Sequence, residues 1–160
     1  MAPPAMAGEP AAQPTFENPE PALIFLVRHA EKEIGPEDPA LSEAGRERAA
    51  VLARLLQDAG IDSIYSTDFK RTRDTATPLA IRLGLEVAIY DPAKLGDLAA
   101  SIKQRRGRCL VVGHSNTTPE LVGLLGGQPG AAIDEESEYD RLFVVTIGPD
   151  GTVATVLLRY

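Results

Sequence analysis

A run of five apolar residues, Leu23 to Val27, constrains the fold more than any other feature of the chain. A run with no polar residue between its hydrophobic ones is typical of a strand buried on both faces. Such a strand needs helices packed on both sides of its sheet, as in parallel α/β domains. The run ends at Arg28 and His29, and α/β sheets bind ligands where their parallel strands end.

Helical and strand-like segments alternate along most of the chain. Ser42 is predicted to cap a helix that runs to about Ala59, with Gly60 at its C-terminal end. Thr117 or Thr118 is predicted to cap a later helix. Other helices are expected within 70–83, where Pro78 would kink or restart the helix, and near 95–102; other strands are expected at 61–66, 85–90 and 108–112. This alternation predicts a three-layer α/β/α sandwich with a mainly parallel sheet.

The C-terminal segment has a different pattern. Two strand-like stretches, 141–147 and 152–158, flank the turn sequence Gly148-Pro149-Asp150-Gly151. This arrangement predicts an antiparallel hairpin at or near an edge of the sheet.

Residues 1–21 are rich in Pro and Ala and lack hydrophobic periodicity, so we expect a disordered lead-in followed by one domain over 22–160. The tripeptide 5–7 resembles a signal-peptide cleavage site, but no basic or hydrophobic segment precedes it. The default expectation is therefore a soluble cytoplasmic protein, and export by a signal peptide already removed is the alternative. No apolar run reaches the roughly 20 residues that span a bilayer.

The chain carries a net charge of −7, from 16 basic and 23 acidic residues. This balance argues against nucleic acid as a partner, because the phosphate backbone would be repelled. A small anionic substrate is compatible with it if a few arginines converge locally. The single Cys109 excludes an internal disulfide, and its apolar surroundings in the sequence predict that it is buried.

The only two histidines occupy equivalent positions, because His29 and His114 each follow a predicted buried strand. Since the carboxyl ends of parallel strands meet at one edge, we expect the two imidazoles to face each other. The second strand leads into Lys70, Arg71 and Arg73, which could be a solvated helix face. Together with Arg28 they predict a clamp for a phosphate dianion, aided by the amides of a helix that begins near 115–118.

Four segments, in this order and spacing, resemble the histidine phosphatase superfamily, whose larger members include the phosphoglycerate mutases. They are LVRHAEK (26–32), LSEAG (41–45), YSTDFKRTRDTA (65–76) and VVGHSN (111–116). The resemblance runs from about residue 23 to residue 160. The short length is similar to that of compact bacterial phosphatases, including the phosphohistidine phosphatases. The residues that follow the first histidine and the lack of room for insertions argue against mutase activity.

The resemblance implies a phosphoglycerate-mutase-like fold and a phosphatase that hydrolyses phosphomonoesters or phosphoramidates. His29 would accept the phosphoryl group, and the rate would fall at low pH as His29 protonates, within a window of about pH 4 to 8. The phosphate would be bound by Arg28, Arg71, His114, Ser115 and Asn116, with Arg71 preferred to Arg73. No metal or organic cofactor is implied. The partner would be a small phosphorylated substrate or a phosphohistidine protein, with no nucleic acid and no membrane; the oligomeric state stays open.

The general acid is the open assignment. Many members have a glutamate after the third strand, where this chain has Asp91, which equally fits a turn before Pro92. Glu31 is a substitute, and with neither the enzyme would favour good leaving groups such as phosphoramidates. The acidic segment 134–140 is either a solvated loop or a rim that repels strongly anionic substrates.

The same residues exclude two other enzyme classes and leave one alternative. A serine hydrolase is rejected because position 117 is Thr rather than the Gly of a nucleophile elbow, and no His follows Ser115. A zinc hydrolase is rejected because no Cys or His ligand spacing is present. A non-catalytic domain that binds phosphate or a partner is the remaining alternative.

Overall fold

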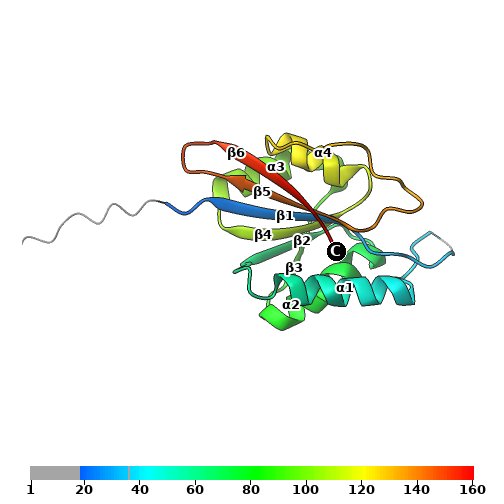
Figure 1. The fold of residues 1–160 in the computed structure, drawn as a ribbon. Coiled ribbons are helices and arrows are strands. Elements are labelled where there is room, and N and C mark those ends of the chain that lie inside the picture. Colours follow the sequence, from blue (N-terminus) through cyan, green and yellow to red (C-terminus); the bar gives the residue numbers. More distant parts are fainter. Residues whose placement is uncertain (1–18, 36) are drawn as a thin grey trace, which may run out of the picture.

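The computed structural model describes residues 19–35 and 37–160. Six strands form a single sheet in the order β3-β2-β4-β1-β5-β6, and helices cover both of its faces (Figure 1). This architecture confirms the predicted three-layer α/β/α class. Almost all of the predicted lead-in, 1–21, lies outside the described residues, so its disorder stays a prediction.

The strands are β1 (Ala22–Arg28), β2 (Ser63–Ser66), β3 (Val87–Ile89), β4 (Arg108–Gly113), β5 (Arg141–Ile147) and β6 (Val153–Arg159). The helices are α1 (Glu43–Leu56), α2 (Lys70–Leu83), the short 3₁₀ turn η1 (Pro92–Lys94), α3 (Leu95–Arg105) and α4 (Thr117–Leu124).

The pairing of the strands decides where the site lies. β3, β2, β4 and β1 run parallel to one another, whereas β5 is antiparallel to β1 and β6 to β5, as predicted for the C-terminal hairpin. Arg28 is in register with Gly113, and Ser66 with Val112. The C-terminal ends of β1, β2 and β4 therefore lie next to one another, at the end of the sheet where the parallel strands finish.

The residues of β1 alternate between two hydrophobic cores. Ile24 and Leu26 pack with the residues of α3 and α4, whereas Phe25 and Val27 pack with those of α1 and α2. Figure 1 shows these two helix pairs on opposite sides of the sheet. Burial on both faces confirms the interpretation of the apolar run, and each large side chain buried in this way contributes about 1.5–3 kcal/mol.

Several predicted boundaries differ from the structure. α1 begins after its Ser42 cap, whose Oγ accepts the Gly45 N–H, but it ends at Leu56, and Gly60 lies in the following turn. α2 continues through Pro78 as one helix. Neither Thr117 nor its neighbour caps α4, because Asn116 occupies that position and the Thr117 hydroxyl instead accepts the His114 N–H at 2.9 Å.

The single cysteine, Cys109, is buried and free, as predicted, and burial raises the pKa of its thiol to about 12.

Within 19–35 and 37–160, no helix combines the length and the apolar character that a membrane span requires.

Candidate active site

The two imidazoles lie side by side at the carboxyl edge of the sheet. The ring centroids of His29 and His114 are 5.5 Å apart, in an edge-to-face arrangement. The backbone N–H of His29 donates to the Gly113 carbonyl at 2.8 Å, which extends the pairing of β1 with β4 to the first histidine. The predicted meeting of the two histidines is confirmed.

His29 is buried, with 3% of its surface exposed. Its Nδ1 lies 2.8 Å from the Ala30 carbonyl oxygen. Because a carbonyl only accepts, Nδ1 carries the proton of the neutral ring and Nε2 keeps its lone pair. Burial lowers the pKa of His29 to about 3 against the opposing effect of the Ala30 hydrogen bond, and the positive charge of Arg28 adds to the lowering. At neutral pH the ring is therefore uncharged, as a nucleophile must be.

His114 is oriented by residues from the end of β2. Its Nε2 lies 2.8 Å from the Thr67 hydroxyl, and its ring meets Phe69 edge-on, with the centroids 5.2 Å apart. Burial and the charge of Arg71 lower the pKa of His114 to about 4. Thr67 was missed in the sequence, where the only signal was a hydroxyl directly after a predicted strand.

The loop from β4 to α4 has room only for glycine before His114. A Cβ on Gly113 would lie 2.9 Å from the Thr117 hydroxyl and 2.9 Å from the hydroxyl of Tyr90. Contacts this short are essentially never made by real Cβ atoms, so a side chain there would displace the start of α4. The Gly-His sequence therefore reflects the close approach of α4 to the sheet edge.

A cavity of about 380 Å³ opens over the two rings. Its lining residues are His29, Lys32, Arg71, His114, Ser115, Asn116 and Glu135. Five of these were predicted site residues, and the structure brings them together. The other two are Lys32, from the exit of β1, which had no predicted role, and Glu135, from the acidic segment that was predicted to be a solvated loop or a rim of the pocket. The cavity is thus lined by two cations, Lys32 and Arg71, and one carboxylate.

Arg71 is the arginine that reaches this cavity from α2. Its guanidinium carbon lies 4.6 Å from the centroid of the Phe69 ring, and its Nε is buried without a hydrogen-bond partner. An unpaired buried donor costs about 1–3 kcal/mol, so an anion that accepts from it would be stabilised there. Arg73 instead pairs with Asp68. The geometry thus supports the preference for Arg71.

Arg28 does not line the cavity. Its guanidinium, 2% exposed, donates to the main-chain carbonyls of Asp134, Glu135 and Glu138 at 2.6 to 3.2 Å. It also stacks on the ring of Tyr139 at 4.0 Å. Only Nε of Arg28 is left without a partner. The terminal nitrogens of Arg28 therefore hold the loop before β5. Of the two arginines expected to clamp a phosphate, Arg28 keeps only Nε unpaired.

Neither predicted candidate for the general acid lines the cavity. Asp91 is exposed and caps η1, with its Oδ1 accepting the Ala93 N–H at 2.9 Å, which matches the turn role that its position before Pro92 also predicts. Glu31 is held by Arg48 through hydrogen bonds to both carboxylate oxygens. Burial raises the pKa of Glu31, but these hydrogen bonds outweigh it and leave the pKa below its usual value. A catalytic role for Asp91 stays a prediction without geometric support.

The acidic segment is more than a solvated loop. The Ser115 hydroxyl donates to Oε2 of Glu135, and Oε1 of the same carboxylate lies 3.7 Å from Nη2 of Arg28. Glu138 pairs with Arg141 and Arg159 and lies outside the cavity. One acidic side chain therefore reaches the site, and its neighbours anchor the loop.

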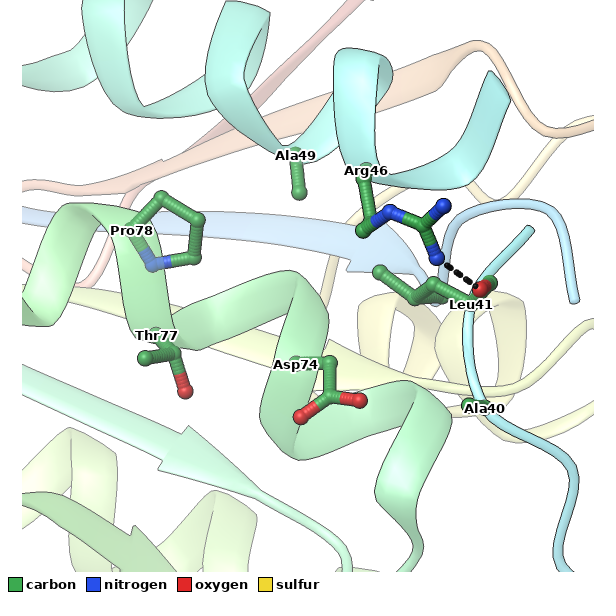
Figure 2. Close-up of a pocket in the computed structure, with 7 residues that line it drawn as sticks. All are labelled: Ala40, Leu41, Arg46, Ala49, Asp74, Thr77 and Pro78. Atoms are coloured by element: carbon green, nitrogen blue, oxygen red, sulfur yellow. Dashed lines mark hydrogen bonds between the residues drawn. The ribbon is translucent and has the colours of Figure 1, made fainter. Parts of the chain in front are cut away.

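A second hollow lies between α1 and α2 and contains neither histidine. Figure 2 shows its lining, with Arg46 donating to the Leu41 carbonyl at 2.9 Å. Its walls are mostly apolar, without converging donors. In the described part of the chain, no three His, Cys, Asp or Glu side chains are grouped so that they could hold a metal ion.

Comparison with known proteins agrees with this geometry. Residues 24–94 match the model of the histidine phosphatase superfamily, branch 1. The probable phosphoglycerate mutase GpmB of Photorhabdus laumondii is 30% identical over 128 residues, which are 76% of this chain and 58% of that protein. Phosphoserine phosphatase 1 of Hydrogenobacter thermophilus is 44% identical over 75 residues, 42% of this chain and 36% of that protein. The chain spans about half the length, or less, of these curated relatives.

Solved structures share the fold at low sequence identity. The protein histidine phosphatase SixA, complexed with tungstate, superposes with a TM-score of 0.68 at 17% identity, over 86% of this chain and 96% of that one. A mycobacterial glucosyl-3-phosphoglycerate phosphatase superposes with a TM-score of 0.67 at 16% identity, over 88% of this chain and 98% of that one. Similarity at this level of identity establishes the common architecture.

Proposed function

The chain belongs to the histidine phosphatase superfamily, and we propose that it hydrolyses phosphomonoesters or phosphoramidates through a phosphohistidine on His29. The observation that carries the proposal is the neutral, buried His29 ring, which shares a cavity with His114 and Arg71. A phosphatase that forms a phosphohistidine needs these features, a ring nitrogen with a free lone pair and fixed positive charge around one anion.

The first step is attack of His29 Nε2 on phosphorus. The bond between phosphorus and the leaving group breaks, and its electron pair departs with that group. Arg71 binds the phosphate oxygens from α2 and His114 contacts them from the end of β4, so that charge developing on the transferring group is stabilised. Both residues are held in place before the substrate arrives, Arg71 by Phe69 and His114 by Thr67.

The second step is attack of water on the phosphohistidine, which releases inorganic phosphate and restores His29. Ser115 and Asn116, at the start of α4, border the same cavity and supply polar groups toward the phosphate. The partial positive charge of a helix N-terminus favours an anion there. Most of the acceleration then comes from positioning and fixed charge rather than from a cofactor.

The substrate class is a small phosphorylated molecule or a protein that carries phosphohistidine. The names of similar proteins include a protein histidine phosphatase, a phosphoserine phosphatase and a probable phosphoglycerate mutase. Release of inorganic phosphate from a panel of phosphohistidine peptides, sugar phosphates and nucleotides would rank these classes.

The proposal is tested by trapping the phosphoenzyme. The protein is mixed with a radiolabelled phosphoramidate and quenched in alkali, which preserves phosphohistidine, and the label is located by mass spectrometry. We expect the label on His29, none in His29→Gln, and slower labelling at the same position in His114→Gln. Turnover that persists in His29→Gln, or a protein that binds phosphate without turnover, would refute the proposal and favour a non-catalytic binding domain.

A further inference from the structure

We propose that Glu135 is the general acid that protonates the leaving group. The inference rests on the function proposed above and assigns the role left open by Asp91. Glu135 belongs to the loop between α4 and β5 and is the one carboxylate among the residues that line the histidine cavity. Its side chain is 71% exposed, so it lies at the mouth, where a leaving group would point away from His29.

Three contacts place this carboxylate. The Ser115 hydroxyl donates to Oε2, which leaves Oε1 to carry a proton. Nη2 of Arg28 is 3.7 Å from Oε1, beyond the length of a hydrogen bond. Nη2 donates instead to the main-chain carbonyl of Glu135 at 2.6 Å, so it holds the residue through its backbone and leaves the carboxyl free to act.

The loop around Glu135 is anchored on both sides. Arg28 also donates to the carbonyls of Asp134 and Glu138, and the Asp134 carboxylate accepts the N–H groups of Glu136 and Ser137. The Glu138 carboxylate is tied to Arg141 at the start of β5. A proton donor must be held within reach of the leaving atom, and these bonds supply that positioning. In this arrangement Arg28 is a positioning residue.

Nearby carboxylates are less suited to the role. Asp91 caps η1 and Glu31 is paired with Arg48, and neither lines the cavity. Glu136 borders only an outer hollow, which lacks both histidines and is also lined by Lys32, Ile34, Tyr139 and Glu135 itself, whereas Glu135 borders the histidine cavity as well. Glu136 therefore provides a matched control, with the same charge one residue further along the loop.

The proposed chemistry balances. As the His29 Nε2–phosphorus bond forms, the phosphorus–oxygen bond of the ester breaks, and the departing oxygen takes the proton of the Glu135 carboxyl to leave as an alcohol. In the second half the Glu135 carboxylate accepts a proton from the attacking water, as the nitrogen–phosphorus bond breaks. The carboxyl and the neutral imidazole are then both restored.

The experiment compares leaving groups in Glu135→Gln, Glu136→Gln and the unaltered protein. p-Nitrophenolate departs without a proton, whereas the alcohol of a simple alkyl phosphate needs one. We expect Glu135→Gln to reduce kcat/KM for the alkyl phosphate by about 100-fold, within the range of general acid catalysis, and to change that for p-nitrophenyl phosphate less than threefold. Glu136→Gln should change neither substrate by more than about threefold.

Each other outcome overturns the inference. An equal loss on both substrates would make Glu135 a structural or binding residue, and no loss on either would remove it from catalysis. A selective loss on the alkyl phosphate in Asp91→Asn, with Glu135→Gln unaffected, would return the role to Asp91. Failure of the proposed function itself is recognised separately, because the unaltered protein would then form no phosphohistidine.

Discussion

The properties of the two histidines depend on their surroundings more than on their residue type. The sequence places the protonation of His29 near the ordinary histidine value, within about pH 4 to 8. Burial moves the pKa to about 3 for His29 and to about 4 for His114. His29 of the free protein therefore stays neutral over the whole physiological pH range. We expect the loss of rate that follows protonation of His29 to begin below the predicted window of about pH 4 to 8.

This shift is checked by NMR titration of the imidazole protons, which is simple because the chain has only two histidines. We expect neither ring to titrate between about pH 5 and 8. Because the unfolded chain takes up protons near pH 6.5 and the folded one only near 3 to 4, the free energy of unfolding should fall as the pH drops below about 6.5. A midpoint near 6.5 for either ring would contradict the burial argument.

Phosphate affinity is a second property of a single side chain. Arg71→Ala should weaken binding of inorganic phosphate by about 10- to 100-fold, the equivalent of losing one charge-assisted contact of about 1.5–3 kcal/mol. Isothermal titration calorimetry measures the change. Arg73→Ala is the control, since Arg73 pairs with Asp68 outside the cavity and its loss should leave the affinity nearly unchanged. Equal losses in both variants would show that only net charge matters.

Among the elements, α1 and β1 explain why the second motif contains a glycine. A Cβ on Gly45, in the first turn of α1, would lie 2.0 Å from the Glu31 carbonyl oxygen. The same carbonyl accepts the Ser42 N–H at 2.9 Å. The LSEAG motif therefore brings the start of a helix against the chain that leaves β1, at Glu31, two residues beyond His29, and so supports the segment that carries His29.

Replacement of this glycine tests that packing. Gly45→Ala should lower the free energy of unfolding by about 3 kcal/mol, because the backbone must move to accept the methyl group. Gly96→Ala in α3 is the matched control: nothing lies within 4 Å of its Cβ position, and alanine favours a helix by about 0.5–1 kcal/mol. Urea denaturation measures both. Equal stability of the two variants would show that the α1 start is not tightly packed.

At the scale of the molecule, one arginine joins segments far apart in the chain. Arg28, at the end of the central strand β1, holds three carbonyls of the loop before β5, which lies 106 to 110 positions away. The planar guanidinium presents several donors at once, whereas a lysine ammonium is a single compact centre. The wall of the cavity that carries Glu135 is thus fastened to the strand that carries His29.

Arg28→Lys should make the loop 134–138 open more readily. We expect amide hydrogen exchange to speed up in residues 134–138 by about tenfold or more, because opening the loop then breaks fewer charge-assisted hydrogen bonds. The strands β1 and β4 should exchange as before. Mass spectrometry of the peptides reports both regions in one experiment. Uniformly faster exchange would mean that Arg28 stabilises the whole domain rather than the loop.

The sequence by itself determined the fold class and the meeting of the two histidines. These follow from local patterns, because continuous apolar runs report burial on both faces and parallel strands end at one edge. The helix limits near Gly60 and Thr117 were less well predicted, since their hydrogen bonds are made with neighbouring turns.

Three features were decided only by the tertiary structure. They are the hydrogen-bond partners of Arg28, the carboxylate that reaches the cavity, and the size of the pKa shift of each imidazole. Each depends on groups from distant segments: loop carbonyls for Arg28, Ser115 for Glu135, and Gly113, His114 and Tyr139 for His29. The sequence pattern records which residues are buried. It does not record which partner burial brings within hydrogen-bonding distance, and that pairing determines the chemistry of the site.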